Sequence, residues 1–241
     1  MRHQTRITFG LSLIATLGLA APAAVASPMP DQSPAATPTA AHAATPGSRA
    51  DMDGDGRPDR TTFTKVRSTS RTHTFRLSTR TATGRTISTL ITIPANLSTT
   101  TAKDVWWGAA PIDGVPGAEA VLDRMAGVGD FPDCAVYTIR GGAYRVLRAP
   151  GAKSDRTDWS VSNHPSQISG YAFSTSGGVR RVVASRLKMS SGSWDAPVYS
   201  GYRTTYRWGR TGWISSGTQR VKDLPDKRAQ TYAGWLGITL R

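Results

Sequence analysis

From Thr61 onwards the chain consists of short segments rich in Thr, Val, Ile, Tyr and Trp, separated by Gly-containing turns. In one of them Ile87, Thr89, Ile91 and Ile93 recur at every second position and fall on one face, which is the period of a β-strand. A helical period is rare. The pattern predicts an all-β domain of antiparallel hairpins: a partial propeller, a sandwich or an open barrel. Strands are predicted at residues 61–66, 72–79, 86–93, 105–109, 120–122, 134–140, 144–148, 170–174, 179–186, 197–208 and 213–216, and a short helix within 224–235.

The N-terminal residues lack this pattern. Residues 1–26 read as an export signal, with Arg2 and Arg6 at the positive end, an apolar run at 7–19 and a small-residue cleavage site at 24–26. Residues 27–49 are mostly Ala, Pro, Ser and Thr and are predicted to be a disordered spacer, because they cannot bury enough apolar surface. Residues 50–241 then form the β-rich domain of a secreted protein. No stretch approaches the roughly 20 apolar residues of a membrane span.

The formal net charge of +14 changes the picture of partners. Outside a cell, a strongly basic surface favours anionic cell-wall polymers or glycans. The cations are scattered along the chain, however, and the charge therefore does not locate a site. Cys134 is the only cysteine, so no internal disulfide forms and a bound metal is the natural substitute; Cys134 itself is predicted to be a small buried residue.

The most distinctive segment is the acidic loop at residues 51–59, where Asp recurs at alternate positions and Gly lies between. Ca²⁺ takes about six to eight oxygen ligands, and carboxylates at loop positions 1, 3 and 5, a carbonyl at 7 and a ligand at 9 can surround it. The alternative is a solvated Asp/Gly turn, which leaves the crowded carboxylates without a cation. Thr62 stands where an EF-hand has Glu, so a sensor of that type is excluded. The predicted structural Ca²⁺ ligands are Asp51, Asp53, Asp55, Arg57 (through its carbonyl) and Asp59.

A second, degenerate loop follows. Its Asp113-Gly-x-Pro motif lies 58 residues after the equivalent motif at Asp55, and each is followed by a strand and then a hairpin. The spacing suggests a duplicated unit of about 60 residues. Only Asp113 and Glu119 remain as carboxylates here, so an ion at this loop would need carbonyls and water.

The acidic loop followed directly by a strand resembles the calcium loops of FG-GAP or VCBS-type repeats, the units of integrin-like β-propellers. The resemblance covers residues 51–66, with an echo at 113–122. It implies a structural metal that ties the loop to neighbouring strands. The chain is also similar to small secreted actinobacterial proteins of uncharacterised function that carry such a loop, a Trp-Gly-Ala-Ala segment (107–110 here) and an Asp-Gly-x-Pro-Gly-x-Glu segment (113–119). This likeness implies no activity. About 190 residues give three four-stranded blades at most, fewer than a closed propeller.

An aromatic and basic strand at 197–208 is the second candidate for binding. Alternation places the aromatic residues on one face and the Arg residues on the other. The aromatic face is either core or an exposed surface that stacks on sugar rings or bases. Trp107 and its neighbour Trp106 point to opposite sides of their strand, so one of them is expected to be partly exposed. The candidate ligand-binding residues are Trp107, Tyr202, Arg203, Tyr206, Arg207 and Trp208.

Enzymatic chemistry has little support. Glu119 is the only glutamate, and the local signatures of serine and zinc hydrolases are missing from the sequence. A glycosidase needs two carboxylates about 5 to 10 Å apart, for which the candidates are Asp104, Asp113, Glu119 and Asp123, with Asp113 and Glu119 as the favoured pair. The sequence therefore predicts a secreted, calcium-stabilised, non-catalytic binding or envelope-associated module, with a wall-polysaccharide hydrolase as the alternative.

Overall fold

The computed structural model describes residues 45–127, 132–153 and 157–241. The chain divides into two units, Met1–His42 and Ala43–Arg241, and every described residue belongs to the second. The predicted signal peptide and most of the predicted spacer lie outside the described residues. The spacer boundary at residue 49 needs correction, because Gly47–Ser48 form a strand, β1, paired with the strand that follows the acidic loop.

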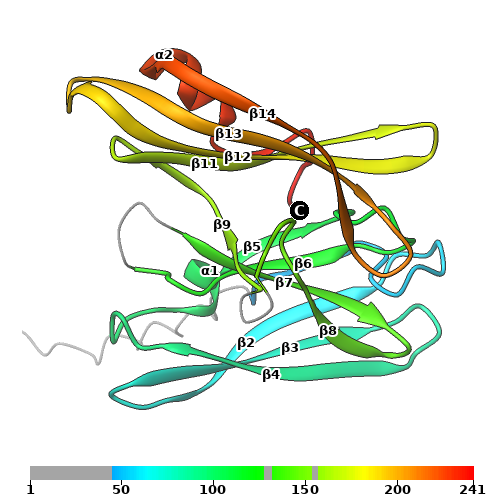
Figure 1. Cartoon of the computed structure of the whole chain (residues 1–241). Coiled ribbons are helices and arrows are strands. Elements are labelled where there is room, and N and C mark those ends of the chain that lie inside the picture. The colour runs from blue at the N-terminus through cyan, green and yellow to red at the C-terminus, as the bar shows by residue number, and fades with distance from the viewer. Residues whose placement is uncertain (1–44, 128–131, 154–156) are drawn as a thin grey trace, which may run out of the picture. The chain divides into compact units, whose positions relative to one another are not determined.

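The described part of the unit is all-β, with strands in three sheets and no closed barrel (Figure 1). The first sheet has the order β1, β2 (Arg60–Ser68), β3 (Thr72–Arg80) and β4 (Thr86–Pro94). The second contains β5 (Trp106–Ala110), β6 (Glu119–Asp123), β7 (Asp133–Arg140) and β8 (Ala143–Leu147), with β9 (Trp159–Ser160) paired to β7. The third contains β10 (Ser162–His164), β11 (Gln167–Ser176), β12 (Val179–Ser193), β13 (Ala196–Trp208) and β14 (Trp213–Pro225), with β15 (Gly234–Leu236) parallel to β11.

Two apolar cores hold the three sheets in layers (Figure 1). Phe63 and Phe75 of the first sheet stack at 4.9 Å and pack with Leu122 of the second. On the other side of the second sheet, Trp159 packs with Tyr171 and Phe173 of the third. The second sheet is therefore buried on both faces, which explains why the whole of β6 is apolar or buried rather than alternating.

Each predicted strand lies on an observed one, and the all-β expectation is confirmed. The differences are local. A helical turn, α1 (Ala102–Val105), precedes β5, and β14 runs far beyond residue 216. The predicted C-terminal helix is reduced to α2 (Asp226–Ala229) and the 3-10 turn η1 (Gln230–Tyr232), because residues 224–225 complete β14 and Gly234 begins β15.

The first two sheets share one topology, a meander whose first and second strands are joined by an Asp-Gly loop. The acidic loop joins β1 to β2, and the degenerate loop joins β5 to β6. The two loops thus occupy equivalent places in adjacent sheets. Cys134 is fully buried in the second core, and desolvation raises the pKa of its thiol far above the ordinary value. Among the helices that the structure describes, none is both long and apolar enough to cross a membrane.

Candidate metal centre

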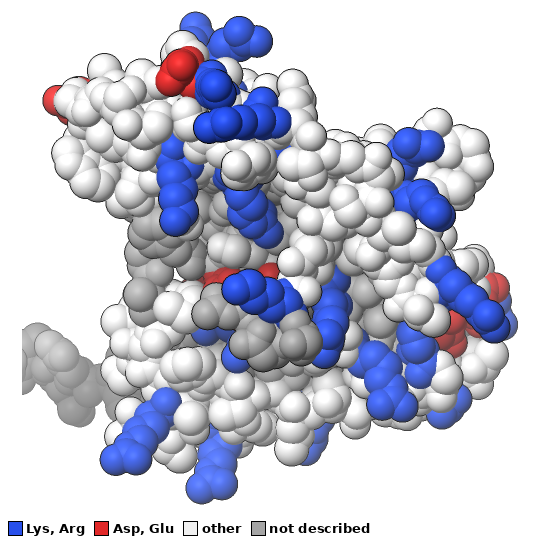
Figure 2. Space-filling model, viewed as in Figure 1, with Lys and Arg blue, Asp and Glu red and all other residues white. Residues whose placement is uncertain are grey.

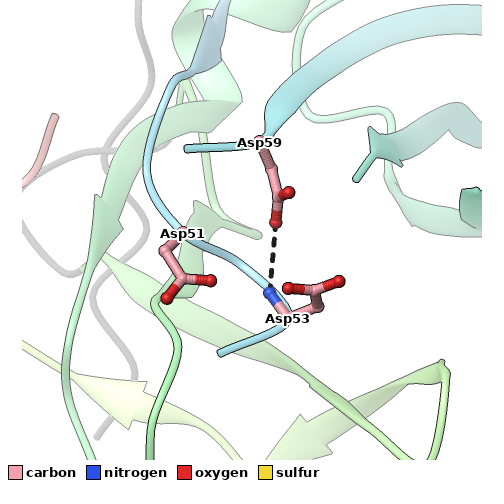
Figure 3. A group of neighbouring side chains, drawn as sticks. All are labelled: Asp51, Asp53 and Asp59. Atoms are coloured by element: carbon pink, nitrogen blue, oxygen red, sulfur yellow. Dashed lines mark hydrogen bonds between the residues drawn. The ribbon is translucent and has the colours of Figure 1, made fainter. Parts of the chain in front are cut away.

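Three carboxylates of the acidic loop converge in front of β2 (Figure 3). Asp51, Asp53 and Asp59 each direct one oxygen to a common point, with these oxygens within 4.8 Å of one another, and could hold a metal ion. Asp59 is buried, whereas Asp51 and Asp53 are half-buried. Asp55 and Arg57, the other two predicted ligands, are exposed, and Asp55 is not part of this group.

Backbone N–H groups fix the orientation of these carboxylates. Asp59 Oδ2 accepts from the N–H of Met52 at 2.8 Å and of Asp53 at 3.2 Å, while its Oδ1 accepts from Ala82 in the β3–β4 turn at 2.8 Å. The Asp51 oxygens accept from the loop glycines at 2.7 and 2.9 Å. Asp59 Oδ1 and the two Asp51 oxygens each accept a single hydrogen bond and keep a second lone pair, so a hard cation can bind these atoms without breaking the bonds. The donor set fits an oxygen-ligated metal.

The electrostatics of the loop also favour a cation. Desolvation raises the pKa of the Asp53 carboxyl, and the charges of Asp59, Asp55 and Asp51 raise it further, against the N–H of Asp55 that lowers it. The neighbouring carboxylates that raise the pKa of Asp53 in this way repel its negative charge. A divalent ion placed among them reverses the sign of that interaction.

The acidic loop also contacts the second loop. The N–H of Ala118 donates to the carbonyl of Asp51 at 2.7 Å. Gly54 has a φ of +82°, and a Cβ at this position would lie 2.4 Å from the carbonyl oxygen of Pro116, so only glycine permits the approach. The candidate metal centre is therefore built into the contact between the first and second sheets.

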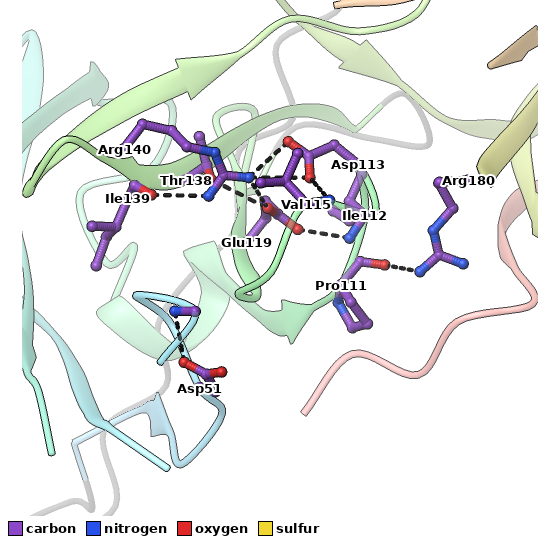
Figure 4. A network of polar contacts seen from close by, with 11 residues as sticks. Asp51, Pro111, Ile112, Asp113, Val115, Glu119, Thr138, Ile139, Arg140 and Arg180 are labelled. Atoms are coloured by element: carbon purple, nitrogen blue, oxygen red, sulfur yellow. Dashed lines mark hydrogen bonds and ion pairs between the residues drawn. The ribbon is translucent and has the colours of Figure 1, made fainter. Parts of the chain in front are cut away.

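At the second loop, the carboxylates bind a protein cation from a neighbouring strand (Figure 4). Arg140, from the end of β7, donates to both oxygens of Asp113 at 2.9 and 3.1 Å and to Glu119 Oε1 at 3.2 Å. Glu119 also accepts from the N–H of Ile112 at 2.6 Å and the hydroxyl of Thr138 at 3.2 Å. Asp113 and Glu119 are 1% and 0% exposed, so their carboxylates form buried ion pairs with a guanidinium that is itself 30% exposed.

Burial raises the pKa of the Glu119 carboxyl. Desolvation, with the nearby charge of Asp113, raises its pKa from 4.5 to about 8, although hydrogen bonds from Ile112 and Thr138 and the charge of Arg140 favour the ionised form. Between pH 4.5 and about 8 the folded protein then holds a proton that the unfolded chain releases.

We therefore expect the wild-type free energy of unfolding to fall relative to that of Glu119→Gln as pH rises from 5 towards 8. The folded state binds more protons than the unfolded state in this window, so its stability declines with pH, while the neutral Gln does not titrate. Urea unfolding of both proteins at a series of pH values measures the effect. If the difference in unfolding free energy between the two proteins stays constant over the series, the pKa of Glu119 is not raised in the folded state.

The side chains of the aromatic strand, β13, lie in different surroundings. Tyr206 and Trp208 are half-buried against the second core, whereas Tyr202 is 54% exposed. On the opposite face, the Arg203 guanidinium lies over the Tyr232 ring at 4.1 Å, and Arg207 is exposed. The structure thus does not bring the predicted ligand-binding residues to one surface. Trp107 lies half-buried in the second core, and Trp106 against the first, on opposite sides of β5 as expected.

Sequence reasoning missed Arg140 as the partner of the second loop, since nothing in the spacing of an Arg 27 residues from Asp113 reveals the contact. The pairing of β6 with β7 brings it there. Comparison of the chain with protein-family models, with curated proteins and with solved structures finds no match.

Proposed function

We propose that this chain is a secreted, calcium-stabilised β-rich module, non-catalytic, that binds anionic polymer or glycan at the cell envelope. The observation that carries the proposal is the convergence of Asp51, Asp53 and Asp59 at the contact between two sheets. Two oxygens bound to one Ca²⁺ at about 2.3 to 2.6 Å lie no more than about 5 Å apart, which agrees with the observed cluster.

The proposed role of the ion is structural. Asp59 contacts the acidic loop, the start of β2 and the β3–β4 turn, and Asp51 contacts the second loop through its carbonyl. An ion held by these residues stabilises the junction of the first and second sheets. Because the hydrogen bonds from Ala82 and Ala118 that hold this loop form only in the folded chain, binding of the ion is coupled to folding.

The hydrolase alternative has less support from the geometry. Asp113 and Glu119 are buried, and both bind the guanidinium of Arg140. A glycosidase needs one carboxylate open to water or to the sugar and a second one open to the glycosidic oxygen. Carboxylates paired inside a core meet neither requirement, which supports the non-catalytic proposal.

We expect Ca²⁺ to raise the thermal midpoint of the secreted chain relative to chelator. An ion at about 100 times its Kd that binds only the folded state adds about 2.7 kcal/mol. For a domain of this size that is roughly 5 to 10 °C. Differential scanning calorimetry in Ca²⁺, in Mg²⁺ and in EDTA measures the shift and its selectivity.

The variant Asp53→Ala should abolish most of this shift, because it removes one of the converging carboxylates. Asp195→Ala removes an equal charge from an exposed turn between β12 and β13 and should leave the shift intact. A wild-type midpoint that is the same in Ca²⁺ and in EDTA would contradict the calcium proposal.

A further inference from the structure

The inner face of the third sheet, which packs on the second sheet, is only partly used as core. Val182 and Ala184 of β12 are buried in the second core, and Arg186 follows them on the same face because side chains alternate along a strand. Arg186 pairs with Tyr202 of β13, and Tyr202 pairs with Arg220 of β14. An Arg-Tyr-Arg row therefore crosses three strands where the apolar contact between the sheets ends.

Two adjoining cavities lie along this row, with volumes of about 500 and 530 Å³. Arg186 and Tyr202 line both, so the cavities form one groove, which we call the basic groove. One end is bounded by Tyr206 and the 149–153 loop, and the other by Gln167 and Arg220. Figure 2 shows basic side chains reaching from the third sheet towards the hollow beneath it.

The groove is electrostatically one-sided. Among the described residues that line it are four cations, Lys153, Arg186, Lys188 and Arg220, and one carboxylate, Asp158. That carboxylate is already neutralised by Arg124 at 2.5 Å. The charge of the lining is therefore complementary to an anionic ligand.

The polar groups of the groove are partly fixed in advance. The Arg186 guanidinium lies over the Tyr171 ring at 4.8 Å and donates to the Tyr171 hydroxyl and to the carbonyl of Ser185. Ser169, next to Arg186 across β11 and β12, has a buried hydroxyl with no hydrogen-bond partner among the described residues. A guanidinium held in one orientation loses less entropy when a carboxylate binds its remaining N–H groups.

We propose that the basic groove binds an acidic oligosaccharide, with one sugar ring stacked on Tyr202 and its carboxylates bound by Arg186 and Arg220. Strand separation places the two Arg residues roughly 10 Å apart, one on each side of the ring. The groove offers one exposed ring and several hydroxyl and amide groups, which suit a sugar. Single-stranded nucleic acid is instead bound by successive aromatic platforms. This inference rests on the proposed binding function and names its site and ligand class.

The test is titration calorimetry of the full secreted chain in Ca²⁺ with a hyaluronan hexasaccharide, which carries one carboxylate per disaccharide. Chitohexaose serves as the neutral oligosaccharide of equal length and a six-nucleotide oligo-dT as the nucleic acid. We expect the hyaluronan fragment to bind more tightly than either, with an affinity that falls as salt rises.

Three variants locate the site. Tyr202→Ala and Arg220→Ala change exposed side chains of the groove, and each should weaken binding about tenfold. Arg181→Ala removes the same charge from the opposite face of β12 and should change the affinity less than about twofold. The thermal midpoint of each variant shows that it is folded.

Three results would overturn the assignment: equal binding of chitohexaose, tighter binding of oligo-dT, or equal losses in Arg220→Ala and Arg181→Ala. Absence of hyaluronan binding would also overturn it. If Ca²⁺ still raises the thermal midpoint in that case, the calcium-stabilised module stands and only the groove assignment fails. If hyaluronan binds but Ca²⁺ does not raise the thermal midpoint, the groove assignment stands and the calcium proposal fails.

Discussion

In chelator, Asp59→Ala should lose about 3 to 5 kcal/mol of unfolding free energy, because a buried acceptor is removed from three backbone donors. The N–H groups of Met52, Asp53 and Ala82 all donate to this carboxylate, which is 2% exposed. Each donor left without a partner costs about 1 to 3 kcal/mol, reduced where water enters. The thermal midpoint should fall by roughly 10 °C. Calorimetry in EDTA measures this effect without any contribution from an ion.

Two variants test whether the lost hydrogen bonds of Asp59 cause this destabilisation. Asp59→Asn keeps one acceptor oxygen and should show a smaller loss than Asp59→Ala. Asp55→Ala removes an exposed carboxylate of the same loop and should change the stability in EDTA by no more than about 0.5 kcal/mol. If Asp59→Ala unfolds in EDTA like the wild type, the three hydrogen bonds do not stabilise the loop. In Ca²⁺, Asp59→Ala should also lose the stabilisation by the ion.

The acidic loop was predictable because its geometry is local. The Asp residues lie within one short segment, and glycine between them permits the turn that brings their side chains together. The departure concerns Asp55, which the spacing includes and the structure leaves exposed. Spacing gives the residues that can reach an ion, whereas the folded loop decides which carboxylates lie together, namely those of Asp51, Asp53 and Asp59.

The basic groove was not predictable in the same way, because it depends on strand register. The pair Trp208 and Trp213 closes the β13–β14 hairpin, and an unbroken register from there would place Gln219 opposite Tyr202. A bulge between the pairs of Thr205 and Tyr206 shifts the register by one residue and brings Arg220 there instead. A shift of one residue exchanges the faces of a strand, so one bulge decides whether that cation lines the groove.

The two Asp-Gly loops occupy equivalent positions in their sheets, but the negative charges of their carboxylates are compensated in different ways. In the first loop, the carboxylates face one another and Asp53 has a raised pKa. In the second, Asp113 and Glu119 bind Arg140 from the neighbouring strand. The guanidinium of Arg140 already neutralises the second loop without an ion from solution. We therefore expect the acidic loop, and not the second loop, to depend on calcium.

Arg140→Met should therefore be strongly destabilising whether or not Ca²⁺ is present. It leaves Asp113 and Glu119 buried without their cation, and breaking a buried ion pair from one side typically costs about 3 to 5 kcal/mol. The loss should be larger at pH 8 than at pH 5, because burial and the charge of Asp113 already raise the pKa of Glu119 to about 8 and protonation relieves the penalty. Urea unfolding at the two pH values measures both effects.

Two further variants test whether uncompensated charge is the cause. The stability of Arg140→Lys, which keeps the charge but not the forked geometry, should fall between that of Arg140→Met and that of the wild type. The triple variant Arg140→Met, Asp113→Asn, Glu119→Gln removes every charge of the network and should recover much of the stability, since neutral groups no longer need the cation. If the single and triple variants are equally unstable, the penalty comes from lost packing of the Arg140 side chain and not from uncompensated charge.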